Sequence, residues 1–450
     1  MADLTSNLEQ QLNDFDPQVR SEALDALLDL VEAEVITLPP PAEVANMHCH
    51  TFFSYNGYGY SPTALAWLAR REGYKLMGIV DFDVLDGVDE FLKACDRVAL
   101  RGSAGMETRA HVPEFSQREI NSPGEPGVIY HMGIGFTDSR VPEDQPAARA
   151  ILADMRQRAL DRNRAMIQRV NDYLDPIVVD YEEDVLPLTP AGNATERHMV
   201  TAYVGQAQEQ LTDPVGFWAT KLRLARDQIA AIIDDRPQIQ NLVRAKLMKR
   251  GGVGYVQPGP DTFPTIEEVN QVITACAALP CITWLDGTSE GEQAAEELFD
   301  LLIAKGAVAL NIVPDRNWRI RDPQEKQLKL RNLYATVALA QTLALPINVG
   351  TEMNAYGAPL IDAFDTPELA PVREAFLDGA YFIYGHTMLA CALDLGYQSP
   401  WASAHFTTRR ERNSFYTRVG RAAQPGTPTL AGLRACARDV DPKTLLKELA

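Results

Sequence analysis

A regular alternation of short apolar runs with helical segments constrains the fold of this 450-residue chain more than any other feature. Strands are predicted over 76–80 and 128–134, and a helix over 62–72. After residue 251 the alternation resumes, with helices over 265–279, 293–305 and 328–343 and strands over 281–284, 307–313 and 346–349. Strands separated by helices of about 10–15 residues are typical of βαβ units around a parallel sheet. We therefore expect an α/β protein, built as a distorted (β/α)7 TIM-like barrel.

The alternation is interrupted between residues 137 and 250. One long helix over 149–174 and one or two helices within 215–249 are predicted there, which indicates a mostly helical insertion. Before the barrel, leucines at helical spacing follow Asp16 and Pro17, an N-cap and a first-turn proline. The expected organisation is an N-terminal helical extension over 1–40, a barrel over 41–136 and 251–395, the insertion over 137–250, and a C-terminal helical segment over 396–450.

The chain is acidic, with 61 Asp and Glu against 42 Lys and Arg and a formal net charge of −19. A surface of this sign repels phosphate backbones, so we expect no role as a nucleic-acid scaffold. A small phosphorylated substrate stays possible, because a metal or an arginine cluster can reverse the sign inside a pocket. The six cysteines form no CxxC pair, and no apolar run approaches the roughly 18 residues of a membrane helix. We therefore expect a cytoplasmic protein that does not bind or span a membrane. Its oligomeric state stays open.

Polar residues cluster at the C-terminal ends of the predicted strands, where barrel enzymes form their active sites. His48 and His50 follow a short strand-like stretch. In an extended chain, residues two apart point the same way, so these two imidazoles can converge on one cation. On this spacing alone, two surface histidines are the simpler interpretation.

Four further motifs follow in chain order, and each has a simpler structural interpretation. Asp81 and Asp83 end an apolar strand and can cap the next helix, whereas Glu107 can be a solvated loop carboxylate. His131 can be a core histidine, and Glu352 can belong to a helix-start turn. Taken together, imidazoles and carboxylates at successive strand ends favour a site for Zn²⁺, Mn²⁺ or Fe²⁺.

In this order the motifs resemble those of the PHP (polymerase and histidinol phosphatase) superfamily of metal-dependent phosphoesterases. The resemblance covers roughly 45–136 and 251–390. The stretches that carry it are His48-Cys49-His50-Thr51, Gly78-Ile79-Val80-Asp81-Phe82-Asp83, Gly105-Met106-Glu107 and His131-Met132-Gly133-Ile134-Gly135-Phe136. The insertion resembles the helical insert of a bacterial nucleotide- or RNA-phosphoesterase branch, through Thr195-Glu196-Arg197-His198.

The chain departs from the pattern of this family at four positions. Phe82 and Leu285 stand where the family has histidines, and the family's closing Asp and His are Glu352 and Asn354. Phenylalanine and leucine cannot bind a metal, so a full trinuclear centre is not expected.

The resemblance implies a first metal site at His48, His50, Glu107 and Glu352. A second, weaker site would keep Glu107 and His131, with Asp286 in place of the lost histidine. We therefore expect one or two divalent ions of zinc, manganese or iron.

Metal-assisted hydrolysis is the expected chemistry, because a bound cation acidifies water and polarises a phosphoryl oxygen. Asp83, Asp286 and His386 are candidate proton shuttles. Arg197 and His198 are expected to reach the substrate from the insertion, which would cover the barrel rim as a lid. Candidate substrate contacts also include Arg316 and Asn354, after two later strands.

Two other functions stay open beside a phosphoesterase that acts on a small phosphorylated or nucleotide substrate. One is a pseudoenzyme, in which a degenerate metal site serves binding, and the replaced histidines are its evidence. The other is a metal hydrolase of a non-phosphate bond, because fold does not fix function.

Overall fold

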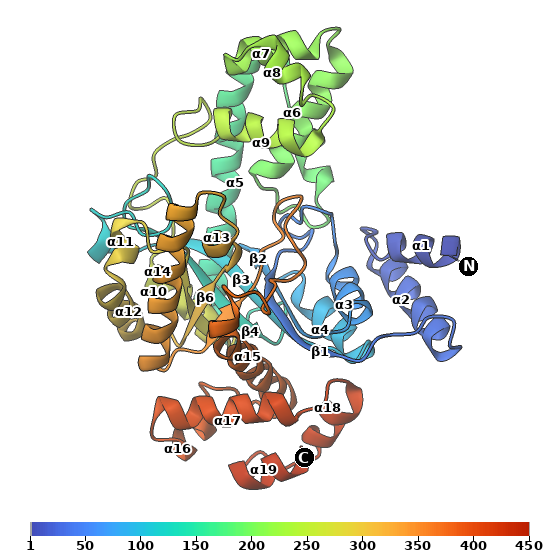
Figure 1. Cartoon of the computed structure of the whole chain (residues 1–450), viewed down its shortest axis with the longest axis vertical. Coiled ribbons are helices and arrows are strands. Elements are labelled where there is room, and N and C mark those ends of the chain that lie inside the picture. Colours follow the sequence, from blue (N-terminus) through green and yellow to red (C-terminus); the bar gives the residue numbers. More distant parts are fainter. Residues whose placement is uncertain (1, 450) are drawn as a thin grey trace.

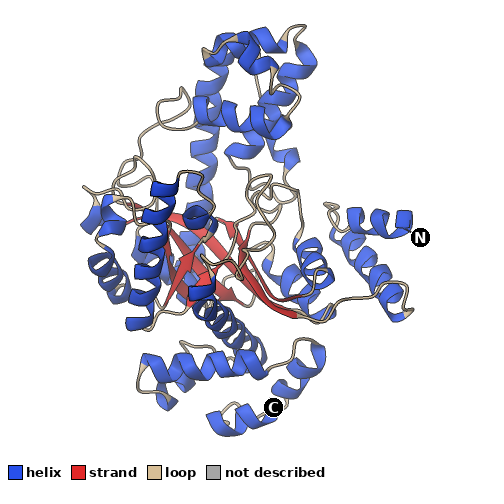
Figure 2. Ribbon diagram, in the orientation of Figure 1, coloured by secondary structure: helices blue, strands red, loops and turns tan. Residues whose placement is uncertain are grey.

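Seven buried apolar runs form one sheet in the order β1 to β7, so that neighbours in sequence are neighbours in space (Figure 1). The computed structural model describes residues 2–449. The strands are β1 (Ala42–Cys49), β2 (Tyr74–Phe82), β3 (Arg101–His111), β4 (Val128–Phe136), β5 (Leu279–Trp284), β6 (Ala309–Ile312) and β7 (Ile347–Val349). The sheet curves almost into a closed barrel, with helices around it (Figure 2), which confirms the expected α/β barrel class.

Helices surround the sheet and form three peripheral segments. The N-terminal segment holds α1 (Ala2–Gln11) and α2 (Pro17–Glu32), and Asp16 caps α2 by accepting from the Gln18 amide, as its sequence predicts. The barrel helices are α3 (Pro62–Arg71), α4 (Val88–Arg97), α10 (Ile266–Ala275), α11 (Glu290–Gln293), α12 (Ala295–Ala304), α13 (Asp315–Trp318), α14 (Pro323–Thr342) and α15 (Arg373–Leu393). The remaining helices are α5 (Pro146–Leu174), α6 (Glu196–Gln210), α7 (Pro214–Leu222), α8 (Arg226–Ala230) and α9 (Arg236–Leu247) in the insertion, and α16 (Pro400–His405), α17 (Arg409–Ala422), α18 (Thr427–Arg434) and α19 (Pro442–Glu448) at the C-terminal end.

The expectation of a wholly parallel sheet is wrong at one strand, because β4 runs antiparallel to both β3 and β5. The segment between β3 and β4 contains one short 3-10 turn, Pro113–Phe115, and no crossover helix. A parallel neighbour needs a crossover of a dozen or more residues, usually a helix, so the chain returns antiparallel here. The C-terminal end of β4 therefore lies at the opposite end of the barrel from the C-terminal ends of β3 and β5.

The last strand closes onto the first through the residues that follow β7. Cys49 and Glu352 form a parallel bridge, in which the His50 amide donates to the Glu352 carbonyl oxygen at 2.7 Å. Gly350 allows this approach, because a Cβ at that position would lie 2.5 Å from the His48 amide nitrogen. The sequence around Gly350 thus brings the two edges of the sheet together beside His48 and His50.

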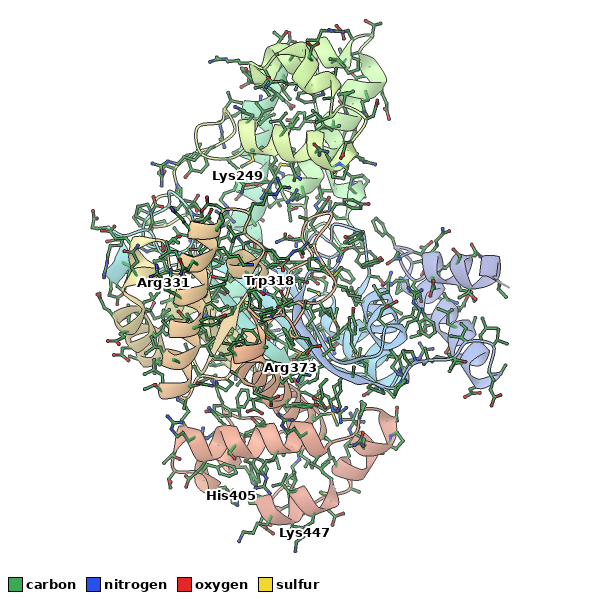
Figure 3. All side chains as sticks on the ribbon, in the orientation of Figure 1. Lys249, Trp318, Arg331, Arg373, His405 and Lys447 are labelled. Carbon is green, nitrogen blue, oxygen red and sulfur yellow. The ribbon has the colours of Figure 1, made fainter. Side chains whose placement is uncertain are left out.

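The long helix α15 packs beneath the sheet, between β7 and the C-terminal helices (Figure 1). His386 on α15 approaches Gly135 at the end of β4, where its Nε2 lies 3.2 Å from the Gly135 carbonyl oxygen. Gly135 has a φ of 77°, and a Cβ there would come within 2.7 Å of the same Nε2. His405 lies in the C-terminal layer, at the opposite end of the molecule from the insertion (Figure 3).

Helix α5 joins two separate apolar cores. Its first half contributes Ala148 and Met155 to the barrel core, and its second half contributes Ile167 and Val170 to the core of the insertion. A helix of 29 residues spans about 43 Å, which is enough to run along the barrel and emerge above it (Figure 1). Between residues 2 and 449, no helix has the length and apolar character needed to cross a membrane.

Candidate metal centre

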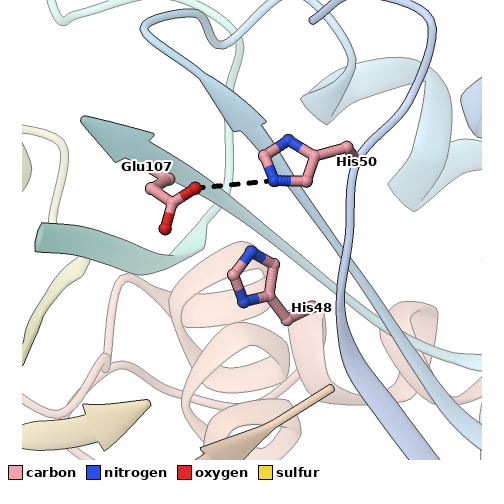
Figure 4. A group of neighbouring side chains, drawn as sticks. All are labelled: His48, His50 and Glu107. Atoms are coloured by element: carbon pink, nitrogen blue, oxygen red, sulfur yellow. Dashed lines mark ion pairs between the residues drawn. The ribbon is translucent and has the colours of Figure 1, made fainter. Parts of the chain in front are cut away.

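Two histidines and one glutamate converge inside the open end of the barrel (Figure 4). We call His48, His50 and Glu107 the His–His–Glu cluster. One potential ligand atom from each lies within 4.8 Å of the others, and all three side chains are buried. Ligand atoms of zinc lie about 2.0–2.2 Å from the ion, so small side-chain adjustments would bring all three onto one cation.

Strand geometry explains how the cluster forms. His48 lies near the end of β1, and His50 follows two residues later on the same side, with ring centroids 5.4 Å apart. Glu107 lies in β3 and pairs in register with Phe82 of β2. The His-x-His spacing thus places two imidazoles together, as predicted from the sequence. Strand β3, which lies two strands from β1 in the sheet, supplies the carboxylate.

The Nδ1 atom of each histidine has a partner that fixes the orientation of the ring. His48 Nδ1 lies 3.2 Å from Asn311 Oδ1, which also accepts from the Asn348 amide at 2.9 Å. His50 Nδ1 lies 3.0 Å from Ser54 Oγ, whose hydroxyl donates to Asp81 at 2.6 Å. Because both partner oxygens accept here, both Nδ1 atoms carry the proton, and each Nε2 keeps its lone pair.

The two Nε2 atoms are buried and have no hydrogen-bond partner within the described part of the chain. His50 Nε2 lies 3.5 Å from Glu107 Oε2, which is too long for a good hydrogen bond. Buried polar atoms rarely stay unpaired, so two such nitrogens beside a carboxylate need an explanation. A divalent cation fits this donor set, because imidazole and carboxylate together suit zinc, manganese and iron.

The electrostatics of the cluster also suit a cation. Burial lowers the pKa of His48, which keeps this imidazole neutral, the form that binds metals. Burial alone would lower the pKa of His50, but the nearby negative charge of Glu107 holds that pKa above its ordinary value. The position between His50 and Glu107 therefore stabilises positive charge.

Glu352 faces the same cluster from the closing edge of the barrel. Burial would raise the pKa of its carboxyl, yet the positive charge of Arg316 lowers it, so this carboxylate stays ionised. Arg316 Nη2 donates to both Glu352 oxygens at 3.2 and 3.0 Å, and the Asn354 amide donates to one at 3.1 Å. The structure thus brings Glu352, Arg316 and Asn354 together, whereas Glu352, a predicted ligand, is outside the group of three that lies within ligand distance.

Asp83 and the consecutive residues Glu352 and Met353 at this rim hold left-handed backbone conformations, which non-glycine residues rarely adopt. Asp83 and Glu352 both have a φ of 62°. Such strain costs of order 1–3 kcal/mol and is found mainly where the surrounding structure holds a functional geometry. The Asp83 amide donates to the Glu107 carbonyl oxygen at 2.8 Å, while its carboxylate accepts from Thr108 Oγ at 2.5 Å. Asp83 therefore lies next to the cluster, and its carboxylate is held by the residue that follows Glu107.

The predicted ligand His131 does not join the cluster. In the antiparallel pair of β3 and β4, Glu107 lies opposite Met132, and Thr108 lies opposite His131. Opposite residues share a face and successive residues alternate, so His131 faces away from Glu107. Its Nε2 lies 2.7 Å from Oδ1 of Asn270 on α10, and burial lowers its pKa to about 4. The prediction failed because the register of β4 against β3 places His131 on the opposite face from Glu107.

Asp286 and His386, two of the predicted proton shuttles, also lie away from the cluster. Asp286 is paired with Lys329 at 3.1 Å and accepts from the Thr288 amide at 3.0 Å. His386 lies beneath the barrel, where its two ring nitrogens contact the Gly135 carbonyl and the Tyr397 amide. Both side chains are engaged in local structure, and neither has a contact with His48, His50 or Glu107 among the described residues.

The insertion contacts the barrel rim, but Arg197 and His198 point to a different place from the cluster. His198 Nδ1 accepts from the Thr195 amide at 3.0 Å and so caps α6. The Arg197 guanidinium lies 5.7 Å from the Tyr55 ring centroid and donates to Asn241. Both residues line a cavity beside the rim.

Several residues at the site were missed by sequence reasoning. Ser54 gives no motif signal, although it links His50 to Asp81. Arg162 on α5 has a pKa lowered to about 10 by burial, and the nearby carboxylate of Asp83 opposes that shift. Only the crossing of α5 over the rim places Arg162 there, and no local pattern in the sequence reports such a crossing.

No known protein family matches the sequence, and neither does any curated protein. Among solved structures, the fold is similar to an amidohydrolase from Chromobacterium violaceum, at 15% identity and a TM-score of 0.47, over 74% of this chain and 96% of that one. It is also similar to a protein from Bifidobacterium adolescentis, provisionally named a metal-dependent phosphoesterase, at 19% identity and a TM-score of 0.45, over 71% of this chain and 91% of that one. At these values neither similarity carries an argument about activity.

Proposed function

We propose that this protein is a metal-dependent hydrolase, specifically a phosphoesterase of the PHP type that acts on a small phosphorylated substrate. The observation that carries the proposal is the pair of buried Nε2 atoms of His48 and His50, which have no hydrogen-bond partner in the described chain and face Glu107. The Nδ1 partners of both rings already set the tautomer that ligation requires.

The proposed cation would be held by His48, His50 and Glu107, with the ionised Glu352 carboxylate close by. Three protein ligands are typical of catalytic zinc sites, which keep one position open for water or substrate. When bound, such an ion supplies an acidified water and polarises a phosphoryl oxygen.

The residues around the cluster favour an anionic substrate. Arg316 is held by the charge of Glu352, which raises the pKa of the guanidinium, and Glu107 adds to this effect. Its side chain is 44% exposed, so donors that do not bind Glu352 remain accessible. A guanidinium matches the oxygens of a phosphoryl group through paired hydrogen bonds, so Arg316 is placed to orient that group beside the cluster.

The decisive experiment screens protein reconstituted separately with zinc, manganese and iron against phosphomonoesters, dinucleotides and amides. We expect hydrolysis of at least one phosphoester, its loss in chelator, and its loss in His48→Ala. His405→Ala is the matched control, because this histidine is exposed and lies in the C-terminal layer.

Hydrolysis of amides but not of phosphoesters would mean that the protein is a metal hydrolase of a non-phosphate bond rather than a phosphoesterase. Metal bound without turnover of any substrate in the screen would contradict the enzyme and favour a binding protein. Failure of the reconstituted chain to hold any divalent ion would overturn the metal centre itself.

A further inference from the structure

Two carboxyl groups lie against each other between the loop that follows β7 and the short helix α13. Asp362 lies in this loop, which runs over 350–369, and it is only 2% exposed. Both of its carboxyl oxygens lack a hydrogen-bond partner in the described part of the chain, as does Oδ1 of Asp315 on α13. Buried charges are normally paired and buried polar atoms are normally hydrogen-bonded, so this arrangement needs an explanation.

The groups that face Asp362 supply too little positive charge for it to be ionised. They are Asp315, Trp318 and Arg319 on α13 and the Cys49 thiol on β1. Burial and the negative charge of Asp315 raise the pKa of Asp362 well above its ordinary value, whereas Trp318 and Arg319 lower it by less. Arg319 Nη1 donates to Asp315 Oδ2 at 3.0 Å, so this arginine already neutralises one carboxylate of the pair. The second carboxylate is left without a counter-charge.

A single proton between the two carboxyl groups accounts for these observations. A carboxyl group that keeps its proton is neutral, so its burial costs less, and it gains an O–H that can donate. Oδ1 of Asp315 is the unpartnered acceptor for such a bond, and O–H bonds to a carboxylate are among the stronger hydrogen bonds in proteins. The proton therefore belongs on Asp362, while Asp315 remains the partner of Arg319.

The carboxyl pair joins two segments that also meet at the candidate metal centre. Asp315 directly precedes Arg316, whose guanidinium donates to Glu352 at 3.0 Å. Glu352 lies near the start of the loop that contains Asp362. Apart from the bridge at Glu352, residues 350–369 form no strand and no helix. The position of this loop therefore depends on side-chain contacts such as the one between Asp362 and Asp315.

We propose that Asp315 and Asp362 share one proton, and that this proton holds the loop that carries Glu352 against the helix that carries Arg316. Loss of the proton as pH rises leaves two carboxylates side by side in a buried space, and their repulsion opens the loop. The proton passes from Asp362 to water, and neither a metal ion nor a substrate takes part. The pair is thus a pH-sensitive switch beside the candidate metal centre.

The closed loop holds a proton that the open loop releases. In the open loop the pKa of Asp362 returns to about 3.9, whereas in the closed loop burial and the charge of Asp315 hold this pKa well above its ordinary value. Between these two values, each unit of pH favours opening by up to about tenfold. Below the lower value both states hold the proton, so opening there does not depend on pH.

The test is amide hydrogen exchange over residues 350–369 in the full chain as purified, from about pH 5 to about pH 8. Exchange is expressed as a protection factor, which removes the intrinsic effect of pH and follows the free energy of local opening. We expect protection in the wild type to fall at least about tenfold across this range. Asp362→Asn should stay protected throughout, because its amide donates to Asp315 without titrating. Asp365→Asn is the matched control and should follow the wild type, since the Asp365 side chain is 95% exposed on the same loop.

A second variant and a spectroscopic measurement test the shared proton independently. Asp315→Asn should also lose most of the pH dependence, because its amide can donate to an ionised Asp362. At the acid end of the range, difference infrared spectra should show the carbonyl band of a protonated carboxyl in the wild type and its loss in Asp362→Asn. Asp365→Asn should keep that band.

Protection that does not change with pH in the wild type would overturn the proposal, as would an equal change in Asp362→Asn. A cation would replace the proton if chelator removed the protection and calcium or magnesium restored it in the wild type but not in Asp362→Asn. That outcome would also overturn the proposal. None of these measurements needs turnover, so their outcome is independent of the proposed hydrolase.

Discussion

The amide of Glu352 donates a hydrogen bond to the carbonyl oxygen of His48 at 2.8 Å. The return bond, from the His50 amide to the Glu352 carbonyl oxygen, measures 2.7 Å. These two bonds fix the backbones of three candidate ligands relative to one another. Closure of the barrel and assembly of the site are therefore one structural event.

Gly350→Ala tests this coupling directly. The added Cβ would lie 2.5 Å from the His48 amide nitrogen, with backbone around it that cannot move freely. We expect destabilisation by about 1–3 kcal/mol, typical of overpacking, together with weaker metal binding. The measurements are the urea unfolding midpoint and the metal dissociation constant.

Gly205→Ala is the matched control for that substitution. Gly205 lies within α6 with open space around its Cβ position, so alanine should stabilise the helix by about 0.5–1 kcal/mol and leave metal affinity unchanged. Equal metal affinity in Gly350→Ala and the wild type would show that the closing edge does not set ligand geometry.

Ser54→Ala should weaken metal binding without removing a ligand. The Ser54 hydroxyl accepts from His50 Nδ1 and donates to Asp81, so its loss frees the His50 ring to rotate and to change tautomer. Partners of this kind are worth about 10- to 100-fold in metal affinity. Titration with a competing metal indicator measures the effect, and Ser403→Ala, an exposed serine on α16, should show none.

Phe82→Ala should leave the number of tightly bound ions unchanged and below three. Phe82 stands where a third site would need an imidazole, and its ring instead packs edge-on against Tyr130, with centroids 6.2 Å apart. Elemental analysis of protein purified without chelator gives the count. Three tightly bound ions in the wild type would contradict the assignment of ligands made here.

Features of this site that depend on local residue spacing were predicted from the sequence, whereas those that depend on the placement of distant segments were not. His48 and His50 were predicted together because strand alternation is a local property. The failure at His131 has a different cause, because the face on which it lies depends on the register of β4 against β3, which is a long-range property. Register against the neighbouring strand decides the face on which a side chain appears, so no spacing within 128–136 could reveal the error.

The insertion also shows that the direction of a segment cannot be predicted from local sequence. A lid was expected because the insertion follows β4, but β4 ends beneath the barrel, where Gly135 meets His386. The chain reaches the rim only because α5 is long enough to return along the barrel. The length of α5 was visible in the sequence, whereas its direction was not.

Glu292 should make the stability of the protein depend on pH. Burial raises the pKa of this carboxyl to about 7, although the amides of Leu285, Asp286 and Gly287 donate to it. In the unfolded chain the value is about 4.3. Between these two values the folded state holds a proton that the unfolded state has released, so the free energy of unfolding falls as pH rises through the window.

Urea unfolding near the two ends of this window measures the effect. The fall in the free energy of unfolding should be smaller in Glu292→Gln than in the wild type, by on the order of 1–3 kcal/mol. Glu290→Gln, an exposed neighbour on the same short helix, should behave as the wild type does. An unchanged pH profile in Glu292→Gln would mean that this carboxyl titrates alike in both states.

Asn193→Ala should loosen the insertion from the rim while sparing the metal. The Asn193 amide donates to the carbonyl oxygens of Phe53 and Phe82 at 3.0 and 2.9 Å, and so ties the insertion to two segments that flank the His–His–Glu cluster. Losing these bonds should cost about 1–2 kcal/mol locally. Amide hydrogen exchange in residues 191–194 should accelerate about tenfold, since exchange from a locally opened state follows the free energy of opening. The metal count should stay at the wild-type value, because Asn193 touches no ligand side chain. Asn7→Ala on α1 is the control, and unchanged exchange in Asn193→Ala would show that the insertion is held on the barrel by α5 alone.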